Sequence, residues 1–252
     1  MIDGTDELPN DAALARHLAA GAGEVLLALR SADPESDQSS LGSRGDAAAQ
    51  AHLLDALRRR VPGDAILSEE MADDRSRLSA QRVWIIDPLD GTREYREGRT
   101  DWGVHVALWS EGRLLAGAVA LPGFGEVFVS SPAPELAPRP DGPPRVLVSR
   151  SRPAAEAEAV RAALDGELVP MGSAGAKTMA VLRGQGDVYV HSGGQYEWDT
   201  AAPAVVAAAA GLDVSRLDGS QLEYNRPDPW SPEFLVCRPE LTEQVLAALN
   251  TG

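Results

Sequence analysis

Segment 84–92, which reads WIIDPLDGT, constrains the fold more than any other stretch of the chain. It is a short apolar run followed by two aspartates three residues apart. The apolar residues have the character of the end of a buried strand. Pro88 fixes the backbone of the turn that follows, and Gly91 permits close backbone approach where a helix could begin. The segment predicts a strand, a tight turn and a helix N-terminus, with Asp87 and Asp90 at the turn.

This pattern is typical of a site for metal and phosphate. Hard divalent cations prefer carboxylate oxygens, and a helix N-terminus offers free N–H groups to an anion. A turn that merely joins a strand to a helix can have the same local sequence. The metal interpretation therefore depends on partners elsewhere in the chain.

The net charge of the chain limits the partners and substrates it can bind. Its 252 residues include 38 acidic and 23 basic side chains, a formal net charge of −15. This argues against a nucleic-acid partner and against attraction to anionic membranes. An anionic substrate would also be repelled unless bound cations reversed the local sign. A phosphate-handling site would thus need metal ions.

Cys237 is the only cysteine, so no intramolecular disulfide can form, and its apolar neighbours predict that it is buried. Residues 1–10 are acidic and polar rather than basic and then apolar, and no run approaches the ~18 apolar residues that span a membrane. We expect a cytoplasmic protein without a membrane partner.

Turn residues and apolar spacing predict helices before strands in the first half. Helices are expected at 11–30 and 46–60, with a polar loop between them, and strands at 65–68, 83–86, 103–109, 114–121 and 126–130. Six prolines and little apolar content over 131–144 mark a boundary. We expect an N-terminal α+β unit, 1–133, and a C-terminal α/β unit, 144–252.

The C-terminal unit alternates between strand and helix patterns. Strands are expected at 146–149, 167–170, 188–190 and 234–237, and helices at 154–164, 174–183, 200–210 and from 240 onward. This alternation predicts α/β layering.

Four acidic residues follow predicted strands or precede a predicted helix: Glu69, Asp87, Asp90 and Asp199. If they converge, the site lies in a cleft between the two units, a common place for small-molecule pockets. Two divalent ions roughly 3.5–4 Å apart could polarise a phosphate there and activate a water. Such a mechanism needs no nucleophilic side chain.

Other chemistries have less support. His17, His52 and His105 are expected to be structural or surface residues, while His191 stays ambiguous at the end of a predicted strand. The sequence lacks His or Cys spacings typical of zinc and the Gly-x-Ser-x-Gly elbow of a serine hydrolase. A carboxylate pair could also hydrolyse glycosides, but the Gly-Thr after the second aspartate favours phosphate.

Three separated motifs resemble those of the inositol monophosphatase superfamily of magnesium-dependent, lithium-sensitive phosphatases. They are Leu67-Ser68-Glu69-Glu70, the segment 84–92, and Trp198-Asp199-Thr200-Ala201-Ala202, in the family's order and spacing. The resemblance implies an α+β or α/β fold, a layered αβαβα sandwich with the active site in the cleft between two sub-domains.

The flanks of these motifs are more similar to the 3′(2′),5′-bisphosphate nucleotidase (CysQ-like) branch than to the inositol enzymes. The distinguishing residues are Ser68, Arg93-Glu94-Tyr95 and Glu197, and the segments 148–152 and 172–177 resemble those that line the nucleotide. The resemblance implies hydrolysis of the 3′-phosphate of 3′-phosphoadenosine 5′-phosphate, a by-product of sulfate activation, and of its 5′-phosphosulfate.

The resemblance also assigns residue roles. It implies two or three Mg²⁺ ions held by Glu69, Asp87, the Leu89 carbonyl, Asp90 and Asp199. It implies catalytic roles for Asp46, Thr92 and Glu69, and substrate contacts from Gly91, Thr92, Ser149, Arg152, Ser173, Lys177 and Asp199.

Some positions depart from the family pattern. Ser43 stands where a threonine is expected, and Asp33, Glu35 and Asp37 occur without the usual lysine, so the role of loop 31–45 and of a third metal stays open. Arg152 replaces a histidine, which leaves the selectivity for adenine open.

Substrate alternatives remain because the ions contact only the phosphate. Inositol 1-phosphate and fructose 1,6-bisphosphate would suit the same metal site, and a non-catalytic metal-dependent ligand-binding protein is a third reading. The expected partner is a small phosphate ester, an adenine nucleotide, and the family implies a homodimer.

Overall fold

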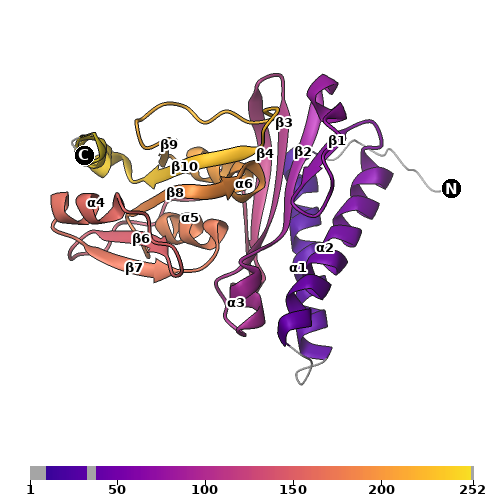
Figure 1. Ribbon diagram of the computed structural model, residues 1–252, viewed down its shortest axis with the longest axis horizontal. Coiled ribbons are helices and arrows are strands. Elements are labelled where there is room, and N and C mark those ends of the chain that lie inside the picture. Colours follow the sequence, from indigo (N-terminus) through magenta and orange to yellow (C-terminus); the bar gives the residue numbers. More distant parts are fainter. Residues whose placement is uncertain (1–9, 33–37, 251–252) are drawn as a thin grey trace.

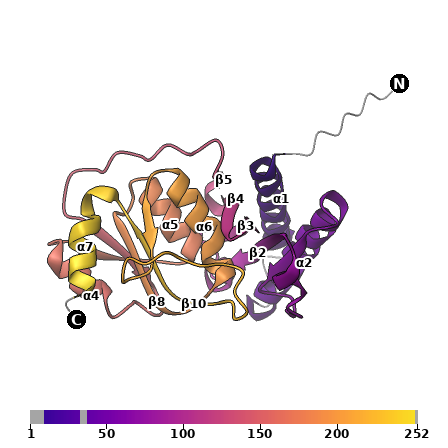
Figure 2. The same ribbon diagram turned by 90° about the horizontal axis from the view of Figure 1, so that it is seen from above.

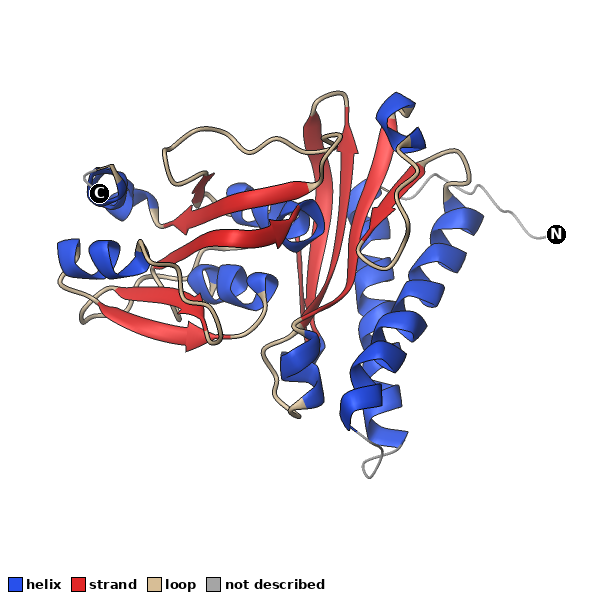
Figure 3. Ribbon diagram, in the orientation of Figure 1, coloured by secondary structure: helices blue, strands red, loops and turns tan. Residues whose placement is uncertain are grey.

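The computed structural model describes residues 10–32 and 38–250. Helices and two sheets alternate in layers in the order αβαβα (Figure 1 and Figure 2). Figure 3 shows helices between the two sheets and on both outer faces. The layered architecture expected from the sequence is confirmed.

The first sheet has five strands in the order β1-β2-β3-β4-β5. β1 (Ala65–Ser68) pairs parallel with β2 (Arg82–Asp90), and the remaining strands are antiparallel: β3 (Gly103–Ser110), β4 (Arg113–Leu121) and β5 (Glu126–Val129). Because β1 and β2 run in the same direction, their C-terminal ends lie at one edge of the sheet.

Two long helices, α1 (Asp11–Ala32) and α2 (Gln38–Arg60), cover the outer face of this sheet. Their leucine and alanine side chains form one core cluster with alternate residues of β2, β3 and β4. Helical spacing on one side and strand alternation on the other produce this core.

The second sheet has the order β7-β6-β8-β10-β9. Its strands are β6 (Arg145–Ser149), β7 (Glu167–Met171), β8 (Val188–Tyr196), β9 (Asp213–Ser215) and β10 (Trp230–Cys237). α4 (Ala157–Ala163) and α7 (Thr242–Leu249) lie on its outer face, with α5 (Ala174–Leu182) and α6 (Glu197–Ala209) between the sheets.

Small residues bring the middle layer close to the first sheet. A Cβ on Gly117 of β4 would lie 2.5 Å from Val205 Cγ1 of α6. α5, α6 and the inner faces of both sheets share a second core cluster rich in alanine. This close packing places the N-termini of α5 and α6 against the end of β2.

α2 differs from the expectation. The polar loop was expected to continue to residue 44, but the helix begins at Gln38. Gly45 explains part of this, because a Cβ there would lie 3.1 Å from side-chain atoms of Leu26, Leu89 and Tyr95. Tight packing therefore keeps a polar, glycine-containing segment helical. The acids at 33, 35 and 37 lie outside the described residues.

Four strands were incompletely predicted. β2, expected at 83–86, spans Arg82–Asp90, and β10, expected at 234–237, begins at Trp230. β8 was expected to end at Val190 but continues to Tyr196, where α6 follows directly. β9 was not predicted, since three residues beside β10 carry too little pattern. The extension of β8 carries Asp199 to the interior of the molecule.

By length and composition alone, α1 could cross a membrane. It is the one such helix among the described residues. Arg16, His17 and Glu24 interrupt its apolar residues, so it is not an unbroken apolar run. Leu14, Leu18 and Leu26 on α1 are buried against the first sheet and α2. This is the packing of a core helix.

Candidate metal centre and active site

The C-terminal part of β2, just before α3 (Thr92–Arg96), presents the two aspartates of the sequence motif. The register with β3 shifts between Asp87 and Asp90, so the strand is irregular there. Gly91 has φ +88°, and a Cβ on it would lie 3.3 Å from the Cβ of Ser173. Glycine is therefore required both for the backbone conformation and for the approach of α5.

Asp87, Asp90 and Asp199 meet at this turn. Each offers a carboxylate oxygen within 4.8 Å of the oxygens of the other two. Asp199 lies in the first turn of α6, where its Oδ2 accepts a hydrogen bond from the Tyr196 N–H at 2.7 Å. Asp87 and Asp90 belong to the first sheet, whereas α6 continues from β8 of the second sheet. Both sheets thus contribute to one cluster.

Protein donors hold one oxygen of each carboxylate. Asp87 Oδ1 accepts from the Leu89 N–H at 2.9 Å, and Asp90 Oδ2 accepts from Ser173 Oγ and from the Gly175 N–H at 2.8 Å. Among the described residues, no hydrogen bond uses Oδ1 of Asp90 or of Asp199. A set of carboxylates with oxygens left over fits a hard divalent cation.

Glu69 reaches the same place from the end of β1. Ser68 is opposite Ile86 in the parallel pair, so the next residues of both strands lie side by side, and Asp87 is among the groups that shift the pKa of Glu69. The Leu89 carbonyl, which was expected to bind metal, accepts a hydrogen bond from Thr92 Oγ1 at 3.1 Å.

Most carboxyl groups of the cluster have raised pKa values, because they have lost water and few positive charges lie near them. Burial, with the nearby carboxylates, raises the pKa of Asp87 well above its ordinary value and that of Asp199 to about 7. Glu69 has exposed surface, yet loss of water around its carboxyl and repulsion by Glu70 raise its pKa to about 7. In the absence of cations these groups hold protons, which divalent ions would replace.

The pKa of Asp90 shifts in the opposite direction. Burial alone would raise its pKa, but His105, the hydrogen bond from Ser173 and the charge of Lys177 lower it to about 2. It therefore carries a fixed negative charge at the centre of the cluster.

Asp46 on α2 faces the start of α3. The Thr92 side chain lies close enough to lower the pKa of Asp46, while the Thr92 hydroxyl donates to the Leu89 carbonyl. Burial and then the charge of Glu70 raise the pKa of Asp46 to about 7. A Cβ on Gly42 would lie 2.7 Å from Thr92 Cγ2, so this part of α2 packs directly on α3.

His105 also touches the cluster, although the sequence indicated only a structural or surface role. It is buried on β3 opposite Asp87, and its Nε2 lies 3.1 Å from Asp90 Oδ2. Burial would lower its pKa, but Asp90 raises it above the ordinary value. Its position in a predicted strand was visible in the sequence, but the pairing of that strand with β2 was not.

Ser173 and Lys177, expected to contact substrate, lie at the N-terminal end of α5. Ser173 is the N-cap residue and donates to Asp90. The Lys177 ammonium is buried, donates to the carbonyls of Gly172 at 3.3 Å and Ser173 at 2.6 Å, and lies 4.8 Å from the Tyr189 ring centroid. Burial lowers its pKa to about 8.

Ser149 and Arg152 lie at the end of β6. Among the described residues, neither forms a hydrogen bond or ion pair with the carboxylate cluster; Ser149 Oγ accepts from the Arg152 N–H at 3.3 Å. His191 is buried, and burial and then the charges of Lys177 and Arg152 lower its pKa to about 4.

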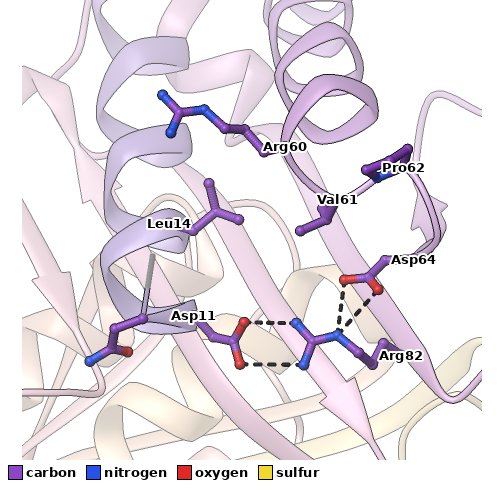
Figure 4. A pocket seen from close by; sticks show the side chains of 8 residues that line it. Asp11, Leu14, Arg60, Val61, Pro62, Asp64 and Arg82 are labelled. Carbon is purple, nitrogen blue, oxygen red and sulfur yellow. Dashed lines mark hydrogen bonds and ion pairs between the residues drawn. The ribbon is translucent and has the colours of Figure 1, made fainter. Parts of the chain in front are cut away.

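A separate pocket of about 590 Å³ lies at the opposite end of β2 (Figure 4). Arg82 in this pocket pairs with Asp11 at 2.7 Å and with Asp64 at 3.0 Å. Its acids are neutralised by an arginine, unlike those of the cluster, so this pocket does not suit a cation.

Comparison with known proteins identifies the family of the chain. The model of the inositol monophosphatase family matches residues 8–133 and 145–251. The chain is 48% identical over 253 residues to the 3′-phosphoadenosine 5′-phosphate phosphatase of Mycobacterium leprae (strain TN), covering 95% of this chain and 93% of that protein. It is 31% identical to the 3′(2′),5′-bisphosphate nucleotidase CysQ of Escherichia coli (strain K12), covering 76% of this chain and 82% of that protein.

A solved structure, CysQ from Bacteroides thetaiotaomicron, has a TM-score of 0.77 at 26% identity and covers 90% of this chain and 97% of that one. The matches extend over both sheets and over all three clustered aspartates. The chain therefore belongs to the inositol monophosphatase family.

Proposed function

We propose that the chain is a Mg²⁺-dependent 3′(2′),5′-bisphosphate nucleotidase. It removes the 3′-phosphate of 3′-phosphoadenosine 5′-phosphate and, as a second substrate, of its 5′-phosphosulfate, and so consumes a by-product of sulfate activation. The observation that carries this proposal is the cluster of Asp87, Asp90 and Asp199, in a chain similar over almost its full length to a phosphatase of that name.

The metal ligands in this proposal are Glu69, Asp87, Asp90, Asp199 and the Leu89 carbonyl, which would hold two or three Mg²⁺ ions. Ions held there would neutralise phosphate charge and would supply a water of lowered pKa for in-line attack on phosphorus. The support is the oxygen-only donor set and the raised pKa values of carboxyls that lack a cation.

Asp46, Thr92 and Glu69 would act on the attacking water. The Thr92 hydroxyl orients it, and Asp46, with a pKa of about 7, is suited to accept its proton near neutral pH. The backbone N–H groups of Gly91 and Thr92, at the start of α3, would hold the phosphate.

The nucleotide would lie between the cluster and the end of β6. Lys177 and Arg152 provide positive charge for the second phosphate or a base edge, and Ser149 and Ser173 provide hydroxyls. Asp199 would contact the ribose side of the ester.

The remaining expectations belong to this proposal. The enzyme would be cytoplasmic, sensitive to lithium and homodimeric, with sub-domains 1–133 and 144–252 enclosing the site. Size measurement in solution tests the dimer directly.

The first experiment compares substrates. Phosphate release from 3′-phosphoadenosine 5′-phosphate, inositol 1-phosphate and fructose 1,6-bisphosphate is measured with Mg²⁺, and again with added Li⁺. We expect a strong preference for the nucleotide and inhibition by Li⁺. Equal or better use of the sugars would overturn the substrate, and metal binding without release from any ester would indicate a non-catalytic binding protein.

A further inference from the structure

We propose that His105 is a positioning residue, which sets the spacing between Asp90 and the segment that carries Asp199, and so controls metal affinity. This inference rests on the proposed function because it concerns the same metal site. The histidine is not itself a metal ligand in this proposal.

Both ring nitrogens of His105 face oxygen atoms at the cluster. Nε2 lies 3.1 Å from Asp90 Oδ2, and Nδ1 lies 3.2 Å from the Trp198 carbonyl oxygen. Trp198 directly precedes Asp199. One ring therefore contacts both a carboxylate at the end of β2, with Nε2 at ion-pair distance but without an aligned hydrogen bond, and the backbone beside a carboxylate on α6.

The surroundings leave the ring little freedom. His105 has no exposed surface, and a Cβ on Gly175 would lie 2.1 Å from its Nε2. The N–H of Gly175 also donates to Asp90 Oδ2 at 2.8 Å. The absence of a side chain at position 175 thus makes room for the ring while the backbone at 175 holds the same carboxylate.

The cluster needs such a link because its carboxylates come from different sheets and repel one another. Asp90 is anchored to β2 and Asp199 to α6, so any drift between these elements changes the distance between their free oxygens. Partners that orient metal ligands typically contribute about 10–100-fold to metal affinity. A histidine that only fills the core would change stability instead.

The test measures metal binding directly on the full chain. Mg²⁺ and Mn²⁺ are titrated calorimetrically into metal-stripped wild type, His105→Gln and His105→Ala, and thermal unfolding is recorded in EDTA. We expect folded variants whose Kd for the ions is raised about 10–100-fold. In turnover, the Mg²⁺ concentration for half-maximal rate should rise by a similar factor, with kcat largely recovered at saturating Mg²⁺.

Val106→Ala is the matched control. Val106 is the next residue on β3, equally buried, and its side chain belongs to the core formed with α1 and α2. It should lower the unfolding temperature in EDTA and leave the metal Kd unchanged. Wild-type Kd values in both folded His105 variants would overturn the inference.

A double-mutant cycle that combines variants of His105 and Gly175 provides a second test. Gly175→Ala should raise the metal Kd in the wild-type background because its Cβ displaces the ring, and should have a much smaller effect with His105→Ala, where no ring remains. Should His105→Ala fail to fold, an unchanged Kd in both His105→Gln and Gly175→Ala overturns the inference. Wild type that binds Mg²⁺ without hydrolysing the nucleotide would reject the proposed function alone.

Discussion

Two carboxyls of one cluster have opposite pKa shifts. The pKa of Asp90 is lowered to about 2, whereas the pKa of Asp199 is raised to about 7. Asp90 is buried and Asp199 partly buried, which favours the protonated form of both, so the neighbours decide the sign. Asp90 faces His105, Ser173 and Lys177, and Asp199 faces the charge of Asp90 itself. One member stays ionised while the other holds a proton until a cation arrives.

Asp90→Asn tests the central ligand. The amide oxygen can still accept from Ser173 and Gly175, so the fold should persist, but the charge that faces the metal is lost. We expect kcat/KM for the nucleotide to fall by about three orders of magnitude or more, with little change in unfolding temperature. Glu158→Gln on α4 removes the same charge from an exposed site and should keep full activity. Near-normal turnover in folded Asp90→Asn would reject the mechanism.

The metal-free protein should lose stability as pH rises from about 5 to about 7. Folded Asp199 keeps its proton up to about pH 7, whereas the unfolded chain releases it near 3.8. In this window the unfolded state binds fewer protons, so the free energy of unfolding decreases by up to about 1.4 kcal/mol per pH unit for one proton.

Thermal unfolding in EDTA across this window measures the slope. Asp199→Asn removes one of the titrating carboxyls and should make the slope smaller, with Glu69 and Asp46 still contributing. Identical slopes in the two proteins would contradict the raised pKa of Asp199.

At the scale of elements, the β2–α3 turn and the N-terminus of α5 form one unit. Gly91 turns the chain into α3, and α5 places Ser173 and Gly175 as donors to Asp90. A backbone N–H at a helix N-terminus cannot reorient freely. The carboxylate is therefore held in place before any ligand binds.

Gly91→Ala should disturb this turn. A Cβ at φ +88° costs about 1–2 kcal/mol of conformational strain, and it would press on Ser173. We expect a lower free energy of unfolding and weaker Mg²⁺ binding, measured by denaturant titration and calorimetry. Gly63→Ala is the control, because a Cβ there meets nothing within 4 Å. Equal behaviour of the two variants would show that the turn tolerates a side chain.

At the scale of the whole molecule, a buried arginine joins the first sheet's loops to the segment before β10. Arg77, within the short 3-10 helix Ser76–Ser79, donates to Asn225 Oδ1 at 2.6 Å and to the Arg226 carbonyl at 2.9 Å. Glu197, two residues before Asp199, accepts from the N–H groups of Asn225 and Arg226 at 2.7 and 2.9 Å. These bonds connect the start of α6 to the first sheet's loops.

Arg77→Met should loosen this connection. The change leaves a buried amide oxygen and a carbonyl without their donor, which costs about 3 kcal/mol. Chemical denaturation measures the loss, and Arg58→Met, exposed on α2, should change little. A difference below about 0.5 kcal/mol between the two variants would show that the contact has no net effect on stability.

The sequence indicated most elements because its periodicity is strong. β1 and α1 lie close to their predicted bounds, and the motif at 84–92 forms the predicted strand, turn and helix start. The boundaries of α2 and β8 were missed, since the packing of distant side chains on the glycines of α2 and the pairing of β8 with β10 decided them.

The sequence by itself determined the residue types and their local order: acids at the ends of strands, a glycine at the turn and the family motifs. Only the tertiary structure decided which side chains meet. His105 is the clearest example, because its contact with Asp90 depends on the antiparallel pairing of β2 with β3 and on the approach of α5. The pKa values follow the same rule, since burial and neighbouring charge arise from contacts between residues far apart in the chain.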